Sequence, residues 1–419
     1  RASDGRGRRL MASTTEQGLT TDHSQAIADG AHTHGQNPDA AAAAGASRAN
    51  RFASHDLALY APVSGSEEEW RFSPVDRLQR LFDGEAASGR IPVEVSAAPG
   101  VLFEARARNG SATPAVAGIP NDRISAAAWY AAPETVAVTI PANVEAEGET
   151  TVSIRGTGVE GVTGGATSAH ILVTAENHSS GLVLLDHTGS AELAQTVEID
   201  VRDGANLTVV SIHDWDRGSV HGASHRATLG RDATLKHIVV SLGGDVVRVT
   251  VDGEFAAPGS SFEALGLYYA DAGQHLEHRL FVDHAVPRCT SRVTYKGARQ
   301  GAGARRVWVG DVLIREAAEG AATYERNRHL VLTEGARADS VPNLEIETGE
   351  IEGAGHASAT GRFDDEQLFY LTSRGIPTDI ARRLVVRGFF AELIHQIGVP
   401  AVEERLAAAI EAELEVTGH

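Results

Sequence analysis

The amino-acid sequence predicts a mainly β protein whose core is a right-handed parallel β-helix, a solenoid, between about residues 135 and 350. Three observations support this fold class: stretches in which apolar and polar residues alternate, a repeat of 27 to 28 residues, and helical periodicity confined to the two flanks. We therefore expect a solenoid core preceded by a helical N-terminal segment and followed by an α-helical C-terminal domain.

Strands are indicated by alternation with a period of two. Valine and isoleucine alternate with other residues at 135–140, 197–201 and 247–251. In an extended chain this pattern puts the apolar side chains on one face, so we expect half-buried strands. Glycine, aspartate and asparagine separate the strands at short intervals and predict the turns between them.

The repeat links three segments that each carry a turn residue, small residues and then an apolar residue. These segments are residues 204–207, 232–235 and 259–262. Their apolar residues, Leu207, Leu235 and Phe262, are 28 and 27 positions apart. A period in this range is typical of a solenoid in which each coil buries its face on the next. Because the spacing is not constant, a β-sandwich is the structural alternative.

Before the strands, a short helix is predicted after residue 73. Its apolar face carries Val75, Leu78, Leu81 and Phe82. Ser73 is the expected N-cap, and Pro74 fits the first turn of a helix because its fixed φ suits that position. We expect this helix to dock through its apolar face.

After the strands, three amphipathic helices are predicted. Asp364 and Gln367 form a capping box for the first helix. Thr378 caps the second, which ends at Gly398, and Pro400 opens the third. Three short helices cannot bury all their apolar faces on one another, so part of this surface should dock on the solenoid or on a partner.

These patterns divide the chain into four parts. They are a disordered tail (1–51), a mixed helical N-terminal domain (52–134), the β-helix (135–350), and a linker with the C-terminal helices (351–419). The tail is polar and rich in alanine, with no sustained apolar period. Met11 is the only methionine, so we interpret residues 1–10 as an extension upstream of the native start.

Composition restricts the class of protein. The chain has 37 basic and 56 acidic residues, hence a formal charge of −19, which argues against nucleic acid as a partner. It has no apolar run of about 18 residues, so no membrane span is expected. A single cysteine, Cys289, allows no intramolecular disulfide, and we expect a cytoplasmic protein.

Several polar clusters are candidate chemical sites. His213, His221 and His225 stand with two aspartates around Trp215, which invites a metal site. Their spacing matches no named site, so the favoured interpretation is a solvated strand–loop–strand surface. A second set, His275, His278 and His284, is interpreted as the polar face of a strand. Cys289 is interpreted as a small buried filler.

A phosphate-binding loop is absent from the sequence. Such a loop needs a lysine directly after a glycine, and the only lysines, Lys236 and Lys296, do not provide one. We therefore expect that this chain binds no ATP.

Several sequence blocks resemble one known family. They are Pro-Asn-Leu-Glu-Ile at 342–346, His356, and Asp-Asp-Glu-Gln-Leu-Phe-Tyr-Leu-Thr-Ser-Arg-Gly-Ile at 364–376, with further blocks at 284–291 and 327–336. Together they resemble the SufB/SufD family of iron–sulfur cluster assembly proteins, and SufD most closely. The resemblance covers roughly Glu68 to the C-terminus.

This resemblance gives His356 a role. It implies that His356 contributes to the nascent cluster site where SufB and SufD meet, either as an iron ligand or as a carrier of protons. Family members often have a cysteine two residues earlier, where this chain has Ala354. We therefore expect a transient iron–sulfur cluster shared with SufB, with the thiolates supplied by the partner.

The resemblance also implies partners. The chain would be a non-enzymatic scaffold that pairs with a SufB-like paralogue and docks a SufC-like ABC ATPase through its C-terminal helices. The residues expected at the SufC contact are Phe369, Tyr370, Arg374, Ile380, Leu384 and Phe389. Three alternatives stay open: a homodimer of the isolated chain, a SufB-like subunit that binds clusters by itself, and a carbohydrate-active or carbohydrate-binding β-solenoid protein.

Overall fold

The computed structural model describes residues 51–84, 89–109, 115–158, 166–333, 335–362 and 365–416. The expected disordered tail, as far as residue 50, lies outside the described residues. Asp364 of the expected capping box lies outside them as well.

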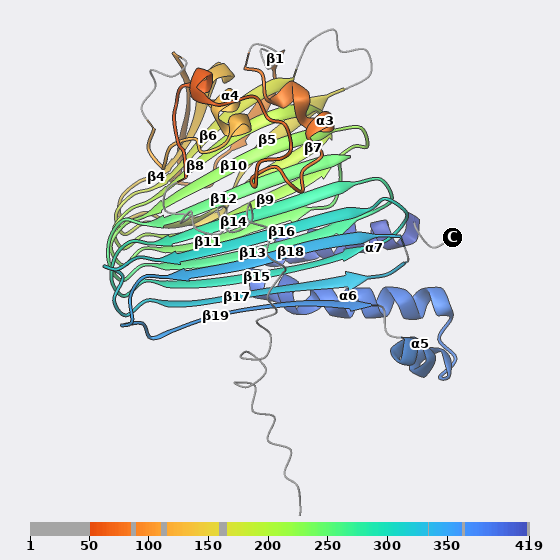
Figure 1. Cartoon of the computed structure of the whole chain (residues 1–419). Helices are drawn as coiled ribbons and strands as arrows, with labels where there is room; N and C mark the ends of the chain where they lie inside the picture. Colours follow the sequence, from red (N-terminus) through yellow and green to blue (C-terminus); the bar gives the residue numbers. More distant parts are fainter. Residues whose placement is uncertain are drawn as a thin grey trace, which may run out of the picture. The chain divides into compact units, whose positions relative to one another are not determined.

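Two stacked sheets form a solenoid of about 7 turns (Figure 1). Each coil contributes one strand to each sheet, and successive coils pair in parallel. Even-numbered strands from β4 to β18 build the first sheet, here called sheet A, and odd-numbered strands from β5 to β19 build sheet B. The predicted mainly β fold with a solenoid core is therefore confirmed.

The strands of sheet A are β3 (Leu102–Ala107), β4 (Glu134–Ile140), β6 (Thr167–Ala175), β8 (Glu192–Val201), β10 (Val220–Leu229), β12 (Val246–Phe255), β14 (His275–His284), β16 (Arg305–Ile314) and β18 (Arg337–Ile346), with β1 (Gly89–Arg90) beside β6. Those of sheet B are β2 (Val93–Ser96), β5 (Glu145–Thr157), β7 (Ser180–Ser190), β9 (Asn206–Trp215), β11 (Thr234–Ser241), β13 (Ser261–Ala270), β15 (Thr290–Arg299), β17 (Ala322–Val331) and β19 (Gly353–Arg362).

The sequence repeat is the register between coils. Leu207 lies opposite Leu235, and Leu235 lies opposite Phe262. All three side chains are at most 1% exposed and point into the solenoid. The next steps are longer, from Phe262 to Ser291 and on to Thr323, because the connections lengthen while the strands keep their ten residues. The repeat predicted from the sequence is therefore present in the structure, but its length varies from coil to coil.

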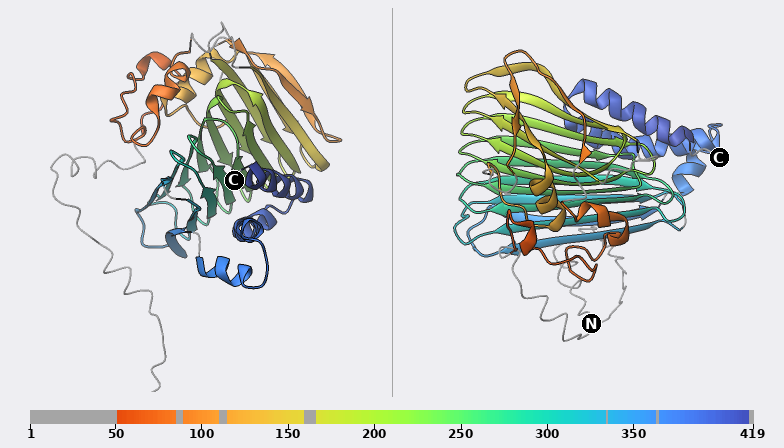
Figure 2. Two further views of the ribbon diagram at one scale, coloured as in Figure 1. Left: turned by 90° about the vertical axis from the view of Figure 1, so that its right-hand side faces the viewer. Right: turned by 90° about the horizontal axis from the view of Figure 1, so that it is seen from above.

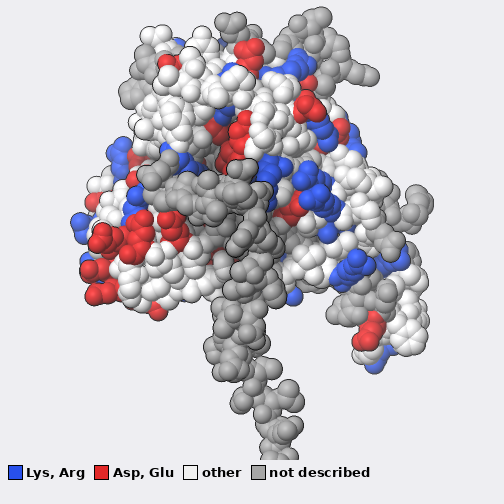
Figure 3. Space-filling view, viewed as in Figure 1, with Lys and Arg blue, Asp and Glu red and all other residues white. Residues whose placement is uncertain are grey.

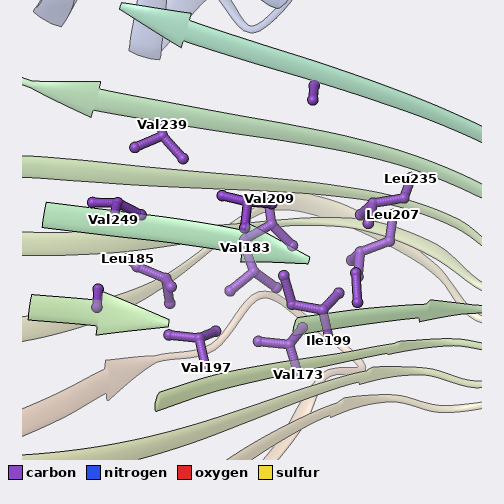
Figure 4. Close-up of a cluster of buried hydrophobic side chains, with 14 of the residues drawn as sticks. Val173, Val183, Leu185, Val197, Ile199, Leu207, Val209, Leu235, Val239 and Val249 are labelled. Atoms are coloured by element: carbon purple, nitrogen blue, oxygen red, sulfur yellow. The ribbon is translucent and has the colours of Figure 1, made fainter. Parts of the chain in front are cut away.

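Apolar side chains from the two sheets meet inside the solenoid (Figure 4). Val183 and Leu185 of β7 and Val197 and Ile199 of β8 are fully buried there. Since successive side chains of a strand alternate in direction, each strand places every second residue in this core. Burying one such side chain contributes about 1.5–3 kcal/mol, so these apolar side chains stabilise the stacking of the coils.

The N-terminal segment covers the outer face of sheet A. It contains η2 (Leu57–Leu59), α3 (Val75–Leu78), η3 (Gln79–Leu81) and α4 (Arg123–Ala131). Leu78, Leu81 and Phe82 are buried as predicted. The expected cap is wrong: the Ser73 hydroxyl donates to Glu277 of β14 (2.8 Å) instead, and Pro74 is the N-cap of α3.

One buried arginine fixes this segment to the sheet. Arg248 of β12 donates to the Asp122 carboxylate (2.7 Å), pairs with Glu69, and lies 4.1 Å from the Trp70 ring centre. Its side chain is 1% exposed. Burial opposes its charge, but the surrounding carboxylates outweigh burial and raise the pKa of Arg248. The predicted half-buried strand at 247–251 is thus buried on both faces.

The C-terminal helices are α5 (Asp365–Thr372), α6 (Thr378–Ile397) and α7 (Pro400–Val416). Helices α6 and α7 cover the outer face of sheet B, on a different side of the solenoid from the N-terminal segment (Figure 2), and α5 packs on α6. Phe390, Leu393 and Leu406 are buried against this sheet. Thr378 begins α6 without capping it, because Pro377 is the N-cap and no side-chain cap bond forms.

The solenoid extends beyond the boundary expected at residue 350. Residues 353–362 form β19, which pairs in parallel with β17 along its whole length. The small residues of this segment suggested a linker, but small side chains also fit a strand that stacks closely on its neighbour. Within the described residues, no helix is long and apolar enough to cross a membrane.

Removing one core side chain should destabilise the solenoid. Leu235→Ala deletes a side chain with no exposed surface from the interior cluster, so we expect the free energy of unfolding to fall by about 2–5 kcal/mol. Urea denaturation followed by circular dichroism measures this. Leu102→Ala, at a residue that is 61% exposed, is the control and should change the value by less than about 0.5 kcal/mol. Equal effects of the two changes would contradict the assignment of Leu235 to the core.

Candidate functional site

The two ends of the solenoid differ. At the N-terminal end, β3 pairs antiparallel with β4 and β2 pairs antiparallel with β5, and these strands terminate the two sheets. At the other end the sheets stop at β18 and β19, and no described strand pairs with their outer edges. Each of these edge strands has ten residues. A long unpaired edge is a template for pairing with another chain.

His356 lies in the edge strand β19, with its side chain exposed. It is in register with Glu325 of β17, and Ala354 is in register with Thr323. In-register residues of parallel neighbours point to the same side of a sheet, and Glu325 points into the solenoid. His356 therefore stands on the interior-facing side of the last coil, at the open end.

Glu325 is a buried carboxyl group beside this histidine. It is 1% exposed, and neither carboxylate oxygen has a hydrogen-bond partner among the described residues. Burial, assisted by the nearby negative Asp311, raises the pKa of Glu325 to about 8. Gly310 of β16 makes room for it, because a Cβ at that glycine would lie 2.8 Å from Glu325 Oε1. The carboxyl group thus holds a proton close to the exposed end of the fold.

A chain of hydrogen bonds reaches the same surface. The amide of Asn327, fully buried on β17, contacts Ser340 Oγ of β18 (2.9 Å), and Ser340 Oγ lies 2.7 Å from Ser358 Oγ of β19. On its inner side, Asn327 Nδ2 contacts His329 Nε2 (2.7 Å), and His329 Nδ1 contacts the buried guanidinium of Arg306. The open end is therefore connected to polar groups inside the solenoid.

Further histidines are buried in the two sheets, which corrects the prediction of a solvated surface. His213, His221 and His225 were expected on a solvated surface, yet none of their side chains is exposed. The second set is buried too, and no member of it is more than 3% exposed: these are His275, His278 and His284. The period-two pattern placed the residues correctly on strands but could not tell an inward face from an outward one.

Cys289 is buried as predicted. Its thiol lies near the backbone oxygens of Ala257 and Pro287, and burial raises its pKa. A buried protonated thiol is a poor metal ligand, because coordination requires the thiolate.

The C-terminal helices leave several large apolar side chains in solvent. The exposed fractions are 73% for Phe369, 55% for Tyr370, 42% for Ile380 and 44% for Leu384. The guanidinium of Arg374, exposed at the end of α5, lies 4.3 Å from the Tyr370 ring centre.

Phe389 differs from the other residues expected at the SufC contact. It is half-buried and faces the solenoid, with the Lys296 ammonium 5.5 Å from its ring centre and bonded to its backbone oxygen (3.0 Å). On the face drawn in Figure 3, acidic and basic side chains are interspersed among uncharged atoms.

Comparison with known proteins identifies the family. A model of the SufBD core domain, from SUF system FeS cluster assembly, matches residues 158–389. The chain belongs to the SufBD family. The recognition made from the sequence blocks is thereby confirmed.

Three relatives show how the SufBD similarity is distributed. An iron–sulfur cluster assembly SufBD family protein of Mycobacterium tuberculosis is 51% identical over 373 residues, covering 87% of this chain and 93% of the relative. SufD of Bacillus subtilis is 26% identical, covering 58% and 57%. A second SufBD family protein of M. tuberculosis is 27% identical, covering 52% of this chain and 26% of the relative. One organism therefore has two different members of the family.

The stability of this SufBD protein should depend on the proton of Glu325. The unfolded chain releases this proton near pH 4.5 and the folded chain near pH 8. The contribution of the protonated Glu325 to stability is therefore fully present below pH 4.5, decreases between these two values, and is lost once the pH has risen through 8. Relative to Glu325→Gln, the free energy of unfolding should fall by up to about 1.4 kcal/mol per pH unit between these values. Urea denaturation at several pH values measures it. Parallel curves for the two proteins would contradict the raised pKa.

Proposed function

We propose that this chain is a SufD-like scaffold subunit of an iron–sulfur cluster assembly complex. In this proposal it pairs with a SufB-like paralogue through the open end of the solenoid and docks a SufC-like ABC ATPase through its C-terminal helices. The observation that carries the proposal is the open end itself, where an unpaired edge, His356 and the protonated Glu325 lie together.

Pairing at the open end is supported by backbone chemistry. The outer edges of β18 and β19 leave N–H and C=O groups available along two strands. Another solenoid of the same family would continue both ladders, burying these groups and extending the core. The small side chains of β19, such as Gly355, Ala357 and Ala359, let a second strand approach closely. A paralogue fits this role because a member of the same family would be built from the same kind of coil.

At this junction His356 would bind or protonate the iron–sulfur cluster while the cluster is being assembled. A neutral imidazole can ligate iron through either ring nitrogen. The only cysteine of the sequence is buried, and burial raises its pKa, so cysteine ligands would come from the partner. The Glu325 carboxyl group, which still holds its proton near neutral pH, would supply or accept protons as sulfide and cluster charges change.

SufC docking is supported by the exposed apolar face of α5 and α6. Phe369 and Tyr370 are more than half exposed although both are large and apolar or aromatic. Such a face usually marks a protein interaction site. Phe389 would act differently from the other residues, by holding α6 on sheet B through Lys296, so that a force on the helices reaches the solenoid. Nothing in the SufBD family assignment favours the carbohydrate alternative.

Co-purification tests the proposed partners. With a tag on this chain and co-expression of the SufB-type and SufC-type proteins from the same source, both should be recovered. Phe369→Ala combined with Tyr370→Ala should reduce recovery of the ATPase by about tenfold and should leave the paralogue bound. These two are the most exposed large apolar or aromatic side chains among the described residues of the helices.

A matched control comes from the opposite end of the fold. Leu102→Ala combined with Phe103→Ala removes two apolar side chains that are 61% and 54% exposed on β3, and should leave both partners bound. If neither partner is recovered with the unchanged protein, the scaffold proposal is wrong. If the control loses the ATPase as strongly as the helix variant, the docking face is wrong.

The role of His356 is tested in the assembled complex. His356→Ala should lower the iron and acid-labile sulfide bound after anaerobic reconstitution by about tenfold, since a direct ligand or proton carrier is removed. His395→Ala is the control, at a histidine of α6 whose side chain is 92% exposed. Normal loading of the His356→Ala complex would show that this residue has no part in cluster formation.

A further inference from the structure

Three histidines meet deep inside the solenoid. His187 of β7, His213 of β9 and His221 of β10 each offer one imidazole nitrogen, and these nitrogens all lie within 4.8 Å of one another. None of the three side chains is exposed. We propose that they form a binding site for one divalent transition-metal ion of the class that prefers imidazole, with zinc and ferrous iron as the two ions to be distinguished. This goes beyond the proposed assembly function and does not depend on it.

The fold itself brings these residues together. His187 and His213 are in register on neighbouring strands, and their rings stack with centres 4.6 Å apart and planes inclined by 15°. His221 begins the next strand after a short turn and faces them from sheet A, with ring centres 5.1 Å from His187 and 5.0 Å from His213. The site is therefore built from strands that the surrounding core holds in place.

The hydrogen bonds at this site cannot all be satisfied by neutral side chains. His187 Nδ1 lies 2.9 Å from the backbone oxygen of Ile212, so it must carry the proton, and Nε2 has only a lone pair. That lone pair lies 2.9 Å from the Gln195 amide oxygen, which also lies 3.1 Å from His221 Nε2. Two acceptors therefore face each other.

Turning the Gln195 amide does not solve the conflict. Its NH₂ group would then suit His187, but His221 Nε2 would also have to accept and carry its proton on Nδ1. His221 Nδ1 already faces the indole N–H of Trp215 (3.1 Å), which can only donate. In the observed orientation, the Gln195 amide nitrogen is buried without a partner among the described residues. A cation among these lone pairs would satisfy the arrangement.

A proton is a poor candidate for that cation. None of the three side chains is exposed, and a protonated imidazole here would bury a charge beside two further imidazoles. Neutral imidazole, in contrast, is the form that ligates a metal. Hard ions such as Mg²⁺ and Ca²⁺ prefer oxygen ligands, which leaves first-row transition metals.

One pair of nitrogens already lies at the spacing of four-coordinate binding. Two nitrogen ligands of one tetrahedral zinc ion lie roughly 3.3 Å apart, given Zn–N bonds of about 2.0–2.1 Å. His213 Nδ1 and His221 Nδ1 lie 3.1 Å apart. The Gln195 oxygen lies 2.9 Å from His187 Nε2 and is placed to complete the set. On binding, the three imidazole nitrogens, which lie within 4.8 Å of one another, would draw together, and the Trp215 side chain would shift so that its N–H no longer faces His221 Nδ1.

This site is separate from His356. From β7 to β19 there are six steps along sheet B, or roughly 29 Å at about 4.8 Å per step. Buried polar groups lie between the two positions, among them the pair His225 and His237 (2.9 Å) and the pair Ser241 and His278 (2.8 Å). Because the site is enclosed, metal must be supplied while the chain folds.

Metal content of the full chain tests the proposal. The protein is expressed in medium supplemented with zinc or, anaerobically, with ferrous salt, dialysed against a chelator, and measured by mass spectrometry of the elements. We expect about one retained ion per chain in at least one of the two arms, and the arm that retains it identifies the metal. His213→Gln and His221→Gln should each reduce retention by about tenfold.

Two controls separate this site from other effects. His284→Gln changes another unexposed histidine inside the solenoid, on β14, and should leave the ion bound. His356→Ala should also leave it bound, so a failure of the assembly proposal does not affect this result. Absence of metal from the unchanged protein in both arms overturns the proposal, as does equal retention by His213→Gln and the unchanged protein.

A spectroscopic measurement needs no substitution. X-ray absorption of the retained metal should show a first shell of nitrogen and oxygen with the outer scattering of about three imidazoles. This readout applies even if a glutamine variant fails to fold. A shell made only of oxygen, or one with fewer than about two imidazoles, would overturn the assignment of the ion to this cluster.

Discussion

The backbone N–H and C=O groups of each coil need hydrogen-bond partners, and the neighbouring coils supply them. The arrangement of the whole molecule depends on this requirement. The N-terminal end meets it with two antiparallel strands, β2 and β3, that close the sheets. The C-terminal end does not, because β18 and β19 pair on one side only. The N-terminal segment and the C-terminal helices cover the outer faces of the sheets, so the end of the stack is where the fold presents unpaired backbone together with His356.

The interior combines two kinds of packing. Valine, leucine and isoleucine fill one part, as in any stacked β protein, while histidines, Gln195, Arg306 and Glu325 line another. Burying these polar groups lowers the stability of the fold unless each finds a partner. Several have none among the described residues, including both oxygens of Glu325 and the amide nitrogen of Gln195. Buried polar groups without a partner are uncommon in folded proteins, so these groups point to interior chemistry rather than to packing alone.

Sequence reasoning reached the fold because the solenoid repeats a local rule. The spacing of Leu207, Leu235 and Phe262 revealed the repeat, and in the structure these residues lie opposite one another on successive strands. The prediction of a role for His356 came from the family blocks and not from its immediate neighbours, and it stays a prediction. Glu325 was missed, since a glutamate in an Arg- and Glu-containing strand looks solvated until the register shows that it points inward. The buried histidines were misplaced for the same reason: alternation reveals two faces but not which face lies inside, and here the N-terminal segment buries the outer one as well.

The missing neighbour of the last coil has a kinetic consequence. In a stack whose units interact only with adjacent units, an end unit loses half of its contacts, so it opens locally before the rest unfolds. The coil formed by β18 and β19 is such a unit, and its side chains are already more exposed than those of the coils before it. Its amide hydrogens should exchange with solvent fastest among the coils, and a bound partner that completes the ladder would slow that exchange. Order in the His356 strand and occupancy of the open edge are thus coupled.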